Sequence, residues 1–182
     1  MYDLEPKRWT RAEYHHLGEL GMLQGRNTEL IEGTIYWVLP PSPRRATTMS
    51  LIHRALSKDE AGSSFTRTRA PLALGNDSEP EPDVTVVKGK PSDYAEEHPS
   101  MALLVAEISD GALSYIRERK QWLYACAGIP EFWIINLADR TIEIRREPRA
   151  GEYRSLRTLK ASGTISPFAL PDIEIPISSF LP

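Results

Sequence analysis

The feature that most constrains the fold is an apolar run that ends on an acid. Residues 101–106 read Met-Ala-Leu-Leu-Val-Ala, and Glu107 and Ile108 follow directly. A short run of this kind predicts a central strand that is covered on both faces. An ionised carboxylate at its end is costly unless it is paired or bound to a metal. The alternative is a strand that emerges at a sheet edge, where Glu107 meets solvent or an arginine.

The elements around this run predict one α/β domain over residues 1–182 with a mixed central sheet. Thr10 and Glu13 form a capping box for the first helix, and Ser42 with Pro43 begins the second. Helices are expected over residues 10–23, 43–60 and 114–127. Strands are expected over residues 29–31, 34–39, 65–74, 83–87, 101–108, 131–137, 141–146 and 153–159. The tail, residues 165–182, is expected to be a surface wrap or an edge.

A lysine lies inside the apolar stripe of the third helix. On a helical wheel, Lys120 falls near the middle of the apolar arc. The arc consists of Leu113, Ile116, Leu123, Tyr124 and Ala127. A lysine at this place either snorkels to solvent or points at a buried negative charge. Glu107 is 13 residues earlier, which leaves enough chain for the helix to fold back over the strand end. We therefore predict that the Lys120 ammonium lies within direct or one-water reach of Glu107.

Asp83 follows a segment in which prolines alternate with acids, Ser-Glu-Pro-Glu-Pro over residues 78–82. The prolines hold this segment extended, so that Asp83 opens a β-branched strand at a place where side chains project into clefts. For Glu79 and Glu81 the ordinary reading is a solvated loop.

Composition excludes several classes of function. The net charge is −3 and the sequence pI is about 5.9, which excludes a basic protein that binds nucleic acid by bulk charge but not a local basic patch or a metal. The single cysteine, Cys126, is expected to be a small packed residue in a reducing cytoplasm. We expect no signal peptide and no membrane span.

For His15 and His16, a solvated helix face is favoured over a zinc site.

Glu29, Pro82-Asp83 and the strand-ending Glu107 occur in an order that resembles the PD-(D/E)XK restriction-endonuclease-like superfamily, and within it the bacterial Uma-type branch. The segments that carry the resemblance are WTRAEY (9–14), ELIEG (29–33), PPSPR (40–44), EPEPDV (79–84), VAEIS (105–109) and GIPEFWI (128–134). The resemblance implies a restriction-endonuclease-like mixed sheet flanked by helices, a divalent metal site and a homodimer.

This chain departs from the superfamily pattern at three positions. Ser109 stands where the superfamily has its lysine, and in the Uma-type branch that lysine has moved to the next helix, where Lys120 matches it. Ile116 stands where relatives often carry aspartate, and Arg45 where they often carry histidine. These changes leave room for weakened or altered activity.

The resemblance also implies roles for four residues in phosphodiester hydrolysis. Asp83 and Glu107 would hold Mg²⁺ or Mn²⁺ through oxygen ligands. Glu29 would add a ligand or hold a metal-bound water. Lys120 would orient or help deprotonate the attacking water and stabilise developing charge. Contacts to the DNA backbone would come from Arg44, Arg45, Arg54, Lys58, Arg67 and Arg69, for which ordinary solvated surface is an equal reading.

The sequence thus predicts a magnesium-dependent nuclease that acts on DNA. The alternative is a nucleic-acid-binding or protein-interaction module that keeps the fold and has lost turnover. Metal binding at the carboxylates separates the two hypotheses.

Overall fold

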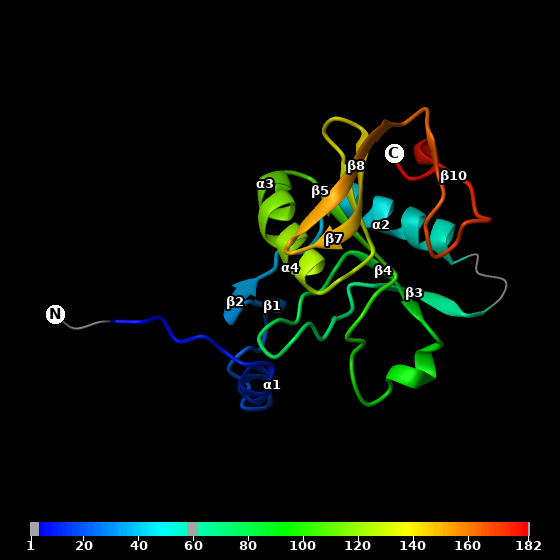
Figure 1. Cartoon of the computed structure of the whole chain (residues 1–182). Helices are drawn as coiled ribbons and strands as arrows, with labels where there is room; N and C mark the ends of the chain where they lie inside the picture. Colours follow the sequence, from blue (N-terminus) through cyan, green and yellow to red (C-terminus); the bar gives the residue numbers. More distant parts are fainter. Residues whose placement is uncertain (1–3, 58–61, 182) are drawn as a thin grey trace.

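A six-stranded mixed sheet runs through the centre of the computed structural model, which describes residues 4–57 and 62–181 (Figure 1). The strand order is β3-β4-β5-β6-β7-β8. The strands are β3 Ser64–Thr68, β4 Val84–Lys88, β5 Leu104–Ser109, β6 Glu131–Asn136, β7 Thr141–Arg149 and β8 Glu152–Lys160. Neighbouring strands are antiparallel except for β5 and β6, which are parallel because a helical crossover joins them.

Helices cover both faces of this sheet (Figure 1). Helix α2, Pro43–Leu56, lies on one face, and the crossover segment with α3, Leu113–Tyr115, and α4, Gln121–Cys126, lies on the other. Helix α1, Arg11–Glu19, lies apart from the sheet beside a small hairpin of β1, Thr28–Ile31, and β2, Thr34–Trp37. The short strands β9, Thr164–Ile165, and β10, Ile175–Pro176, pair in the tail.

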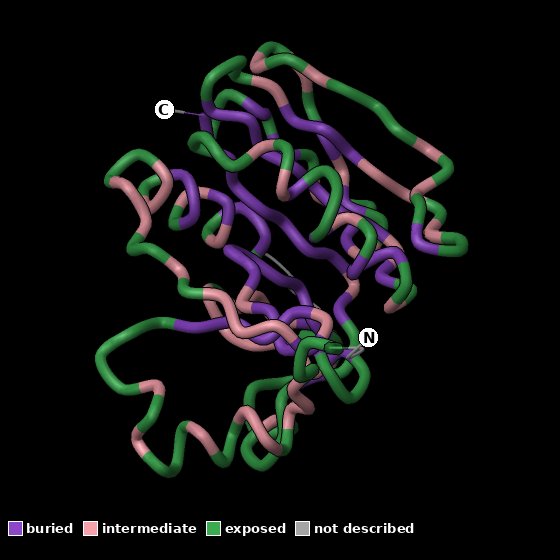
Figure 2. Tube along the Cα trace, turned by 90° about the vertical axis from the view of Figure 1, so that its left-hand side faces the viewer, coloured by how far each residue is buried: buried purple, intermediate pink, exposed green. Residues whose placement is uncertain are grey.

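Alternation along β5 divides the core into two layers. Leu104, Ala106 and Ile108 pack in the layer that contains α2, whereas Val105 packs with α4. Because successive side chains of a strand point to opposite faces, Glu107 points to the α4 side. The buried stretches run through the middle of the molecule and the exposed ones lie at its periphery (Figure 2). The predicted strand covered on both faces is therefore confirmed from Leu104 onward, and every residue of β5 is buried, whereas the expected start at Met101 is wrong because Met101 is exposed.

Local signals in the sequence set the helix starts and the hairpin turn. Thr10 and Glu13 form the predicted capping box of α1, and the Ser42 side chain accepts a hydrogen bond from the Arg45 amide at the start of α2. Glu32 and Gly33 both have positive φ, 48° and 72°, as a tight two-residue hairpin turn requires. The end predicted for α2 near Glu60 lies outside the described residues.

The hairpin is anchored next to the sheet by the proline-rich segment that precedes Asp83. The Glu79 amide donates to the Leu30 carbonyl at 2.6 Å, and the Leu30 amide donates to the Glu79 carbonyl at 3.4 Å. This pairing brings Glu29, the neighbour of Leu30, close to Lys120 of the crossover segment. A residue far from β5 in sequence thus reaches the same region as Glu107.

The structure corrects four expectations. The strand predicted over 65–74 ends at Thr68, because Arg69 adopts a positive φ of 44°. The tail is more than a surface wrap, since Ile177 and Phe180 are fully buried in the α2-side core. Glu79 is buried rather than solvated, and Cys126 is exposed rather than packed.

The third helix is not uniform. A π-helical turn, Ile116–Lys120, separates α3 from α4, so the wheel drawn at 100° per residue does not describe it strictly. Lys120 closes this turn. None of the helices in the described part of the chain combines the length and the apolar character needed to cross a bilayer.

Candidate active site

The register between β4 and β5 brings Asp83 and Glu107 together. Val84 pairs with Ala106 in this antiparallel ladder, so continuing the register by one residue sets Asp83 opposite Glu107 on the same face. Directly opposed residues have Cβ atoms about 5 Å apart. Both side chains are buried. The predicted neighbours are therefore adjacent in space, although Asp83 lies just before the first residue of β4.

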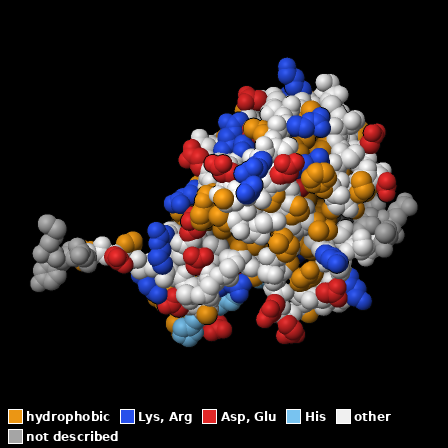
Figure 3. Space-filling model, viewed as in Figure 1, with side chains coloured by type: hydrophobic (Ala, Val, Ile, Leu, Met, Phe, Trp, Pro, Cys, Tyr) orange, Lys and Arg blue, Asp and Glu red, His pale blue; other side chains and the backbone are white. Residues whose placement is uncertain are grey.

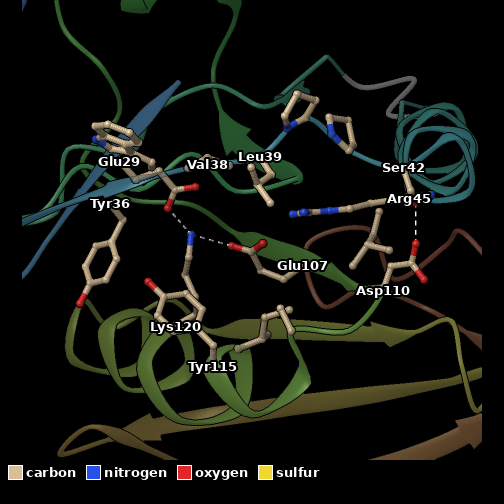
Figure 4. A pocket seen from close by; sticks show the side chains of 16 residues that line it. Glu29, Tyr36, Val38, Leu39, Ser42, Arg45, Glu107, Asp110, Tyr115 and Lys120 are labelled. Carbon is tan, nitrogen blue, oxygen red and sulfur yellow. Dashed lines mark hydrogen bonds and ion pairs between the residues drawn. The ribbon is translucent and has the colours of Figure 1, made fainter. Parts of the chain in front are cut away.

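Lys120 projects from the π-helical turn into the space between two carboxylates. Its Nζ lies 2.5 Å from Glu29 Oε2 and 3.2 Å from Glu107 Oε1 (Figure 4). The predicted approach of Lys120 to Glu107 is confirmed as a direct contact. Burial disfavours the charged ammonium, but the carboxylates of Glu107 and Glu29 outweigh burial and raise the pKa of Lys120 above its ordinary value. Lys120 is therefore held as a cation.

The remaining contacts of Glu107 come from α4. The Tyr124 hydroxyl donates a hydrogen bond to Glu107 Oε1 at 2.6 Å. Burial raises the pKa of Tyr124 well above its ordinary value, so the hydroxyl keeps its proton and stays a donor. Sequence reasoning counted Tyr124 only as an apolar member of the helix stripe. A buried tyrosine has a hydroxyl that needs a hydrogen-bond partner. This property of Tyr124 could have indicated from the sequence that it contacts a polar group.

Arg45 provides the counter-ion of Asp83. From α2, its Nε lies 3.0 Å from Asp83 Oδ2 and its Nη2 lies 2.9 Å from Asp83 Oδ1. The Ile108 amide also donates to Asp83 Oδ2, at 2.8 Å. Burial and the nearby Glu107 nevertheless raise the pKa of Asp83 to about 6, against the opposing effect of Arg45. The sequence suggested that Arg45 contacts a DNA phosphate. In the structure its guanidinium pairs with the Asp83 carboxylate instead.

Glu29, Glu107, Lys120 and Arg45 line one cavity of about 420 Å³. One wall of the cavity is the chain from β2 into α2, residues 36–42. The facing wall consists of residues 110–116 at the start of the crossover. Figure 4 shows the Arg45 guanidinium extended from α2 toward Glu107. Ser42 donates a hydrogen bond to Asp110 at 2.5 Å, which ties the two walls together. A cavity of this size suits a small ligand or one unit of a polymer.

The donor set fits a magnesium ion that keeps part of its water shell. No group of three or more His, Cys, Asp or Glu side chains within residues 4–57 and 62–181 is arranged to enclose a metal. Mg²⁺, however, is usually held by one or two carboxylates together with waters and substrate phosphates. Asp83 and Glu107 supply such a pair. Arg45 is the counter-ion of Asp83, and Lys120 is shared between Glu107 and Glu29.

The arginines expected to contact DNA are largely committed within the protein. Arg44 donates to the Leu137 carbonyl, Arg67 donates to the Pro71 carbonyl, and Arg69 lies 4.0 Å from Glu81. Arg54 is exposed, and Lys58 lies outside the described residues. On the face drawn in Figure 3, basic and acidic side chains are interspersed and form no continuous basic surface.

The two histidines of α1 have separate surroundings. His15 Nε2 lies 2.8 Å from Glu79 Oε1, and Arg11 approaches the same carboxylate at 3.9 Å. His16 lies near Glu19 on the exposed side. These contacts explain how Glu79 tolerates burial, and they fasten α1 to the segment that leads into Asp83.

Replacing Lys120 by methionine tests the charge balance of this site. Sequence alone suggested that Lys120→Met would preserve or improve packing. The structure reverses this expectation, because Glu29 and Glu107 would remain buried without their shared counter-ion. We expect the free energy of unfolding at pH 7 to fall by about 3–5 kcal/mol, measured by urea denaturation. Lys120→Met/Glu29→Gln should recover part of the loss, and Lys88→Met on the surface should cost little. Wild-type stability in Lys120→Met would contradict this assignment.

Asp83 makes stability depend on pH. Its folded-state pKa of about 6 exceeds the ordinary value of 3.8, so the folded protein binds more protons than the unfolded chain between these values. Stability should therefore fall as pH rises from about 4 to about 6, by up to about 3 kcal/mol. We expect the difference in unfolding free energy between wild type and Asp83→Asn, measured with chelator present, to change by this amount. A difference that is constant from pH 4 to pH 7 would refute the raised pKa.

Comparisons with known proteins agree with this architecture. The crystal structure of a protein described as a putative nuclease belonging to DUF820, from Anabaena variabilis, superimposes with a TM-score of 0.70 at 15% sequence identity. The match covers 91% of this chain and 96% of that chain, and it shows the shared fold. No curated protein matches the sequence. A family model described as "Uma2: Putative restriction endonuclease" matches residues 11–178. The chain therefore belongs to the Uma2 family.

Proposed function

We propose that this protein is a nuclease that uses Mg²⁺ or Mn²⁺ to hydrolyse phosphodiester bonds in DNA. The observation that carries the proposal is the pair of buried carboxylates, Asp83 and Glu107, with the Lys120 ammonium in direct contact with Glu107. Carboxylates supply oxygen ligands for a hard cation, and an ammonium supplies charge for a phosphate. The family description and the fold of the Anabaena protein support the same reaction class.

The metal would be held by Asp83 and Glu107. When bound, it would supply Lewis-acid activation of the phosphate and of water. Glu29 reaches the same cavity through its contact with Lys120, and it would orient a water there rather than add to the ligand pair. A cation would also compete with Arg45 for Asp83, because the guanidinium contacts both carboxylate oxygens.

Lys120 would act as a fixed positive charge. A general base must give up its proton near the working pH, whereas the raised pKa of Lys120 keeps it protonated. This disfavours the deprotonating role considered from sequence. The ammonium would instead contact the phosphate oxygens as negative charge develops on them, and it would align Glu29 and Glu107 by its two ion pairs.

A catalytically degenerate module is the second candidate, and one observation favours it. Arg45 and Lys120 already pair with Asp83, Glu29 and Glu107 within the protein, so each carboxylate has a counter-ion without a metal. The DNA substrate, the cation and the homodimer belong to the first proposal. Experiments must decide between that proposal and the degenerate module.

Cation binding and cleavage should depend on the same two carboxylates. We expect Mn²⁺ at 100 times its Kd to stabilise the protein by about 2.7 kcal/mol and to support cleavage of labelled linear and plasmid DNA. Asp83→Asn and Glu107→Gln should lose both effects. Glu118→Gln, an exposed carboxylate on the same crossover, is the matched control and should keep both.

The degenerate module would show neither metal stabilisation nor cleavage in the wild type. Cleavage that persists with chelator present, or in both carboxylate variants, would overturn the proposed site. Chromatography with light scattering on the same samples would test the predicted homodimer.

Arg45 should set the apparent affinity for the cation. Its guanidinium competes with a cation for Asp83 and repels it, so Arg45→Ala is expected to tighten Mn²⁺ binding by about tenfold or more, which corresponds to about 1.4 kcal/mol. Calorimetry or the EPR signal of free Mn²⁺ measures this directly. Arg44→Ala is the control, because the neighbouring guanidinium contacts a backbone carbonyl. Weaker binding in Arg45→Ala would contradict the competition.

A further inference from the structure

The chain from β2 to α2 presents apolar side chains at the mouth of the cavity, and the catalytic proposal does not use them. Trp37 is 63% exposed and Leu39 is 80% exposed, yet both line the cavity. Tyr36 and Tyr115 also line it, with ring centroids 6.0 Å apart. An aromatic and aliphatic rim therefore leads down to a charged floor.

We propose that this rim binds an unpaired nucleobase, so that the substrate is single-stranded DNA or a nucleotide extruded from a duplex. The inference rests on the proposed nuclease function and specifies its substrate class. A nucleotide has an apolar base and a charged phosphate, and the cavity offers an aromatic wall and cationic groups in the matching places. Trp37 is the residue that would stack on the base.

The depth of the floor favours an unpaired strand. Glu107 and Lys120 are only 2% and 4% exposed, so a phosphate must enter the cavity to reach them. A cavity of about 420 Å³ lies in the range of small-ligand sites and admits one nucleotide rather than a turn of duplex.

The surroundings of Trp37 add a cation to the aromatic surface. The Arg26 guanidinium lies 3.0 Å from the centroid of the indole ring and covers one of its faces, so a base would stack on the opposite face. In the described part of the chain, no carboxylate lies within ion-pair distance of Arg26, so its charge is available to a phosphate. A stacking platform combined with a nearby cation is the usual arrangement for binding single strands.

The small number of free basic side chains around α2 and β3 also favours an unpaired strand as the substrate. Arg44, Arg45 and Arg67 are each engaged within the protein, so a long duplex would find few phosphate contacts around α2 and β3. Affinity must then come largely from contacts inside the cavity. Base stacking on the rim provides such a contact without a broad positive surface.

The test compares three labelled oligonucleotides of one sequence: a single strand, a blunt duplex and a duplex with one bulged nucleotide. Binding is measured by anisotropy with Ca²⁺, and cleavage with Mn²⁺. We expect the single strand and the bulged duplex to be preferred at least tenfold over the blunt duplex. Trp37→Ala should weaken binding of the preferred substrates by about five- to a hundredfold, the loss of one stacked base. Trp37→Phe should restore most of it.

Trp122→Ala is the matched control, because Trp122 is also exposed, at 45%, but lines a different cavity. It should leave binding unchanged, and the rise in melting temperature caused by Mn²⁺ should be the same in every tryptophan variant as in the wild type. Equal use of duplex and single strand, or wild-type binding by Trp37→Ala, would overturn the inference and leave the nuclease proposal standing. A change of oligomeric state in Trp37→Ala with unchanged binding would identify the rim as a protein interface and also overturn it. If no oligonucleotide is cleaved, the nuclease proposal fails, and the binding comparison still decides the inference.

Discussion

The buried ammonium of Lys120 holds the site together. Its two ion pairs join Glu29 from the small hairpin, Glu107 from the central sheet and the crossover helix that carries Lys120 itself. Each of these charges would be expensive to bury alone, because the interior solvates ions poorly. Without the lysine, Glu29 and Glu107 would be buried with no shared counter-ion, so the ammonium allows the three elements to pack closely. The same contact keeps a cation next to two carboxylates at the bottom of a cavity.

A second pair, Asp83 and Arg45, joins α2 to the start of β4. The two pairs leave the site nearly neutral in charge, and this neutrality serves both stability and function. It allows five ionised groups to lie in a poorly hydrated region, and it makes a divalent cation compete with guanidinium for Asp83. A site that exchanges an internal cation for an external one binds the metal more weakly than a preformed empty cage, because part of the binding free energy is spent on displacing the guanidinium.

The sequence identified most of these residues because each breaks a local rule. Glu107 ends an apolar run, Lys120 interrupts an apolar stripe, and Asp83 opens a strand after alternating prolines. The capping signals at Thr10 and Ser42 were equally readable, since they depend on hydrogen bonds within one turn. The π-helical turn, the end of β3 at Thr68 and the burial of the tail left no comparable local signal. They result from packing between segments that are far apart in the chain.

By itself, the sequence determined the apolar run that became the central strand, the helix starts and the residue types available for chemistry. These features follow from backbone hydrogen bonding and from the cost of exposing apolar surface, and both act over a few residues. The sequence also predicted that Lys120 meets Glu107, whereas only the tertiary structure decided that Arg45 pairs with Asp83 and that Glu29 pairs with Lys120. The register of β4 against β5 set Asp83 beside Glu107, and the pairing of Leu30 with Glu79 brought Glu29 to Lys120. Partners across tens of residues are selected by the mutual burial of charges, and no local pattern encodes that selection.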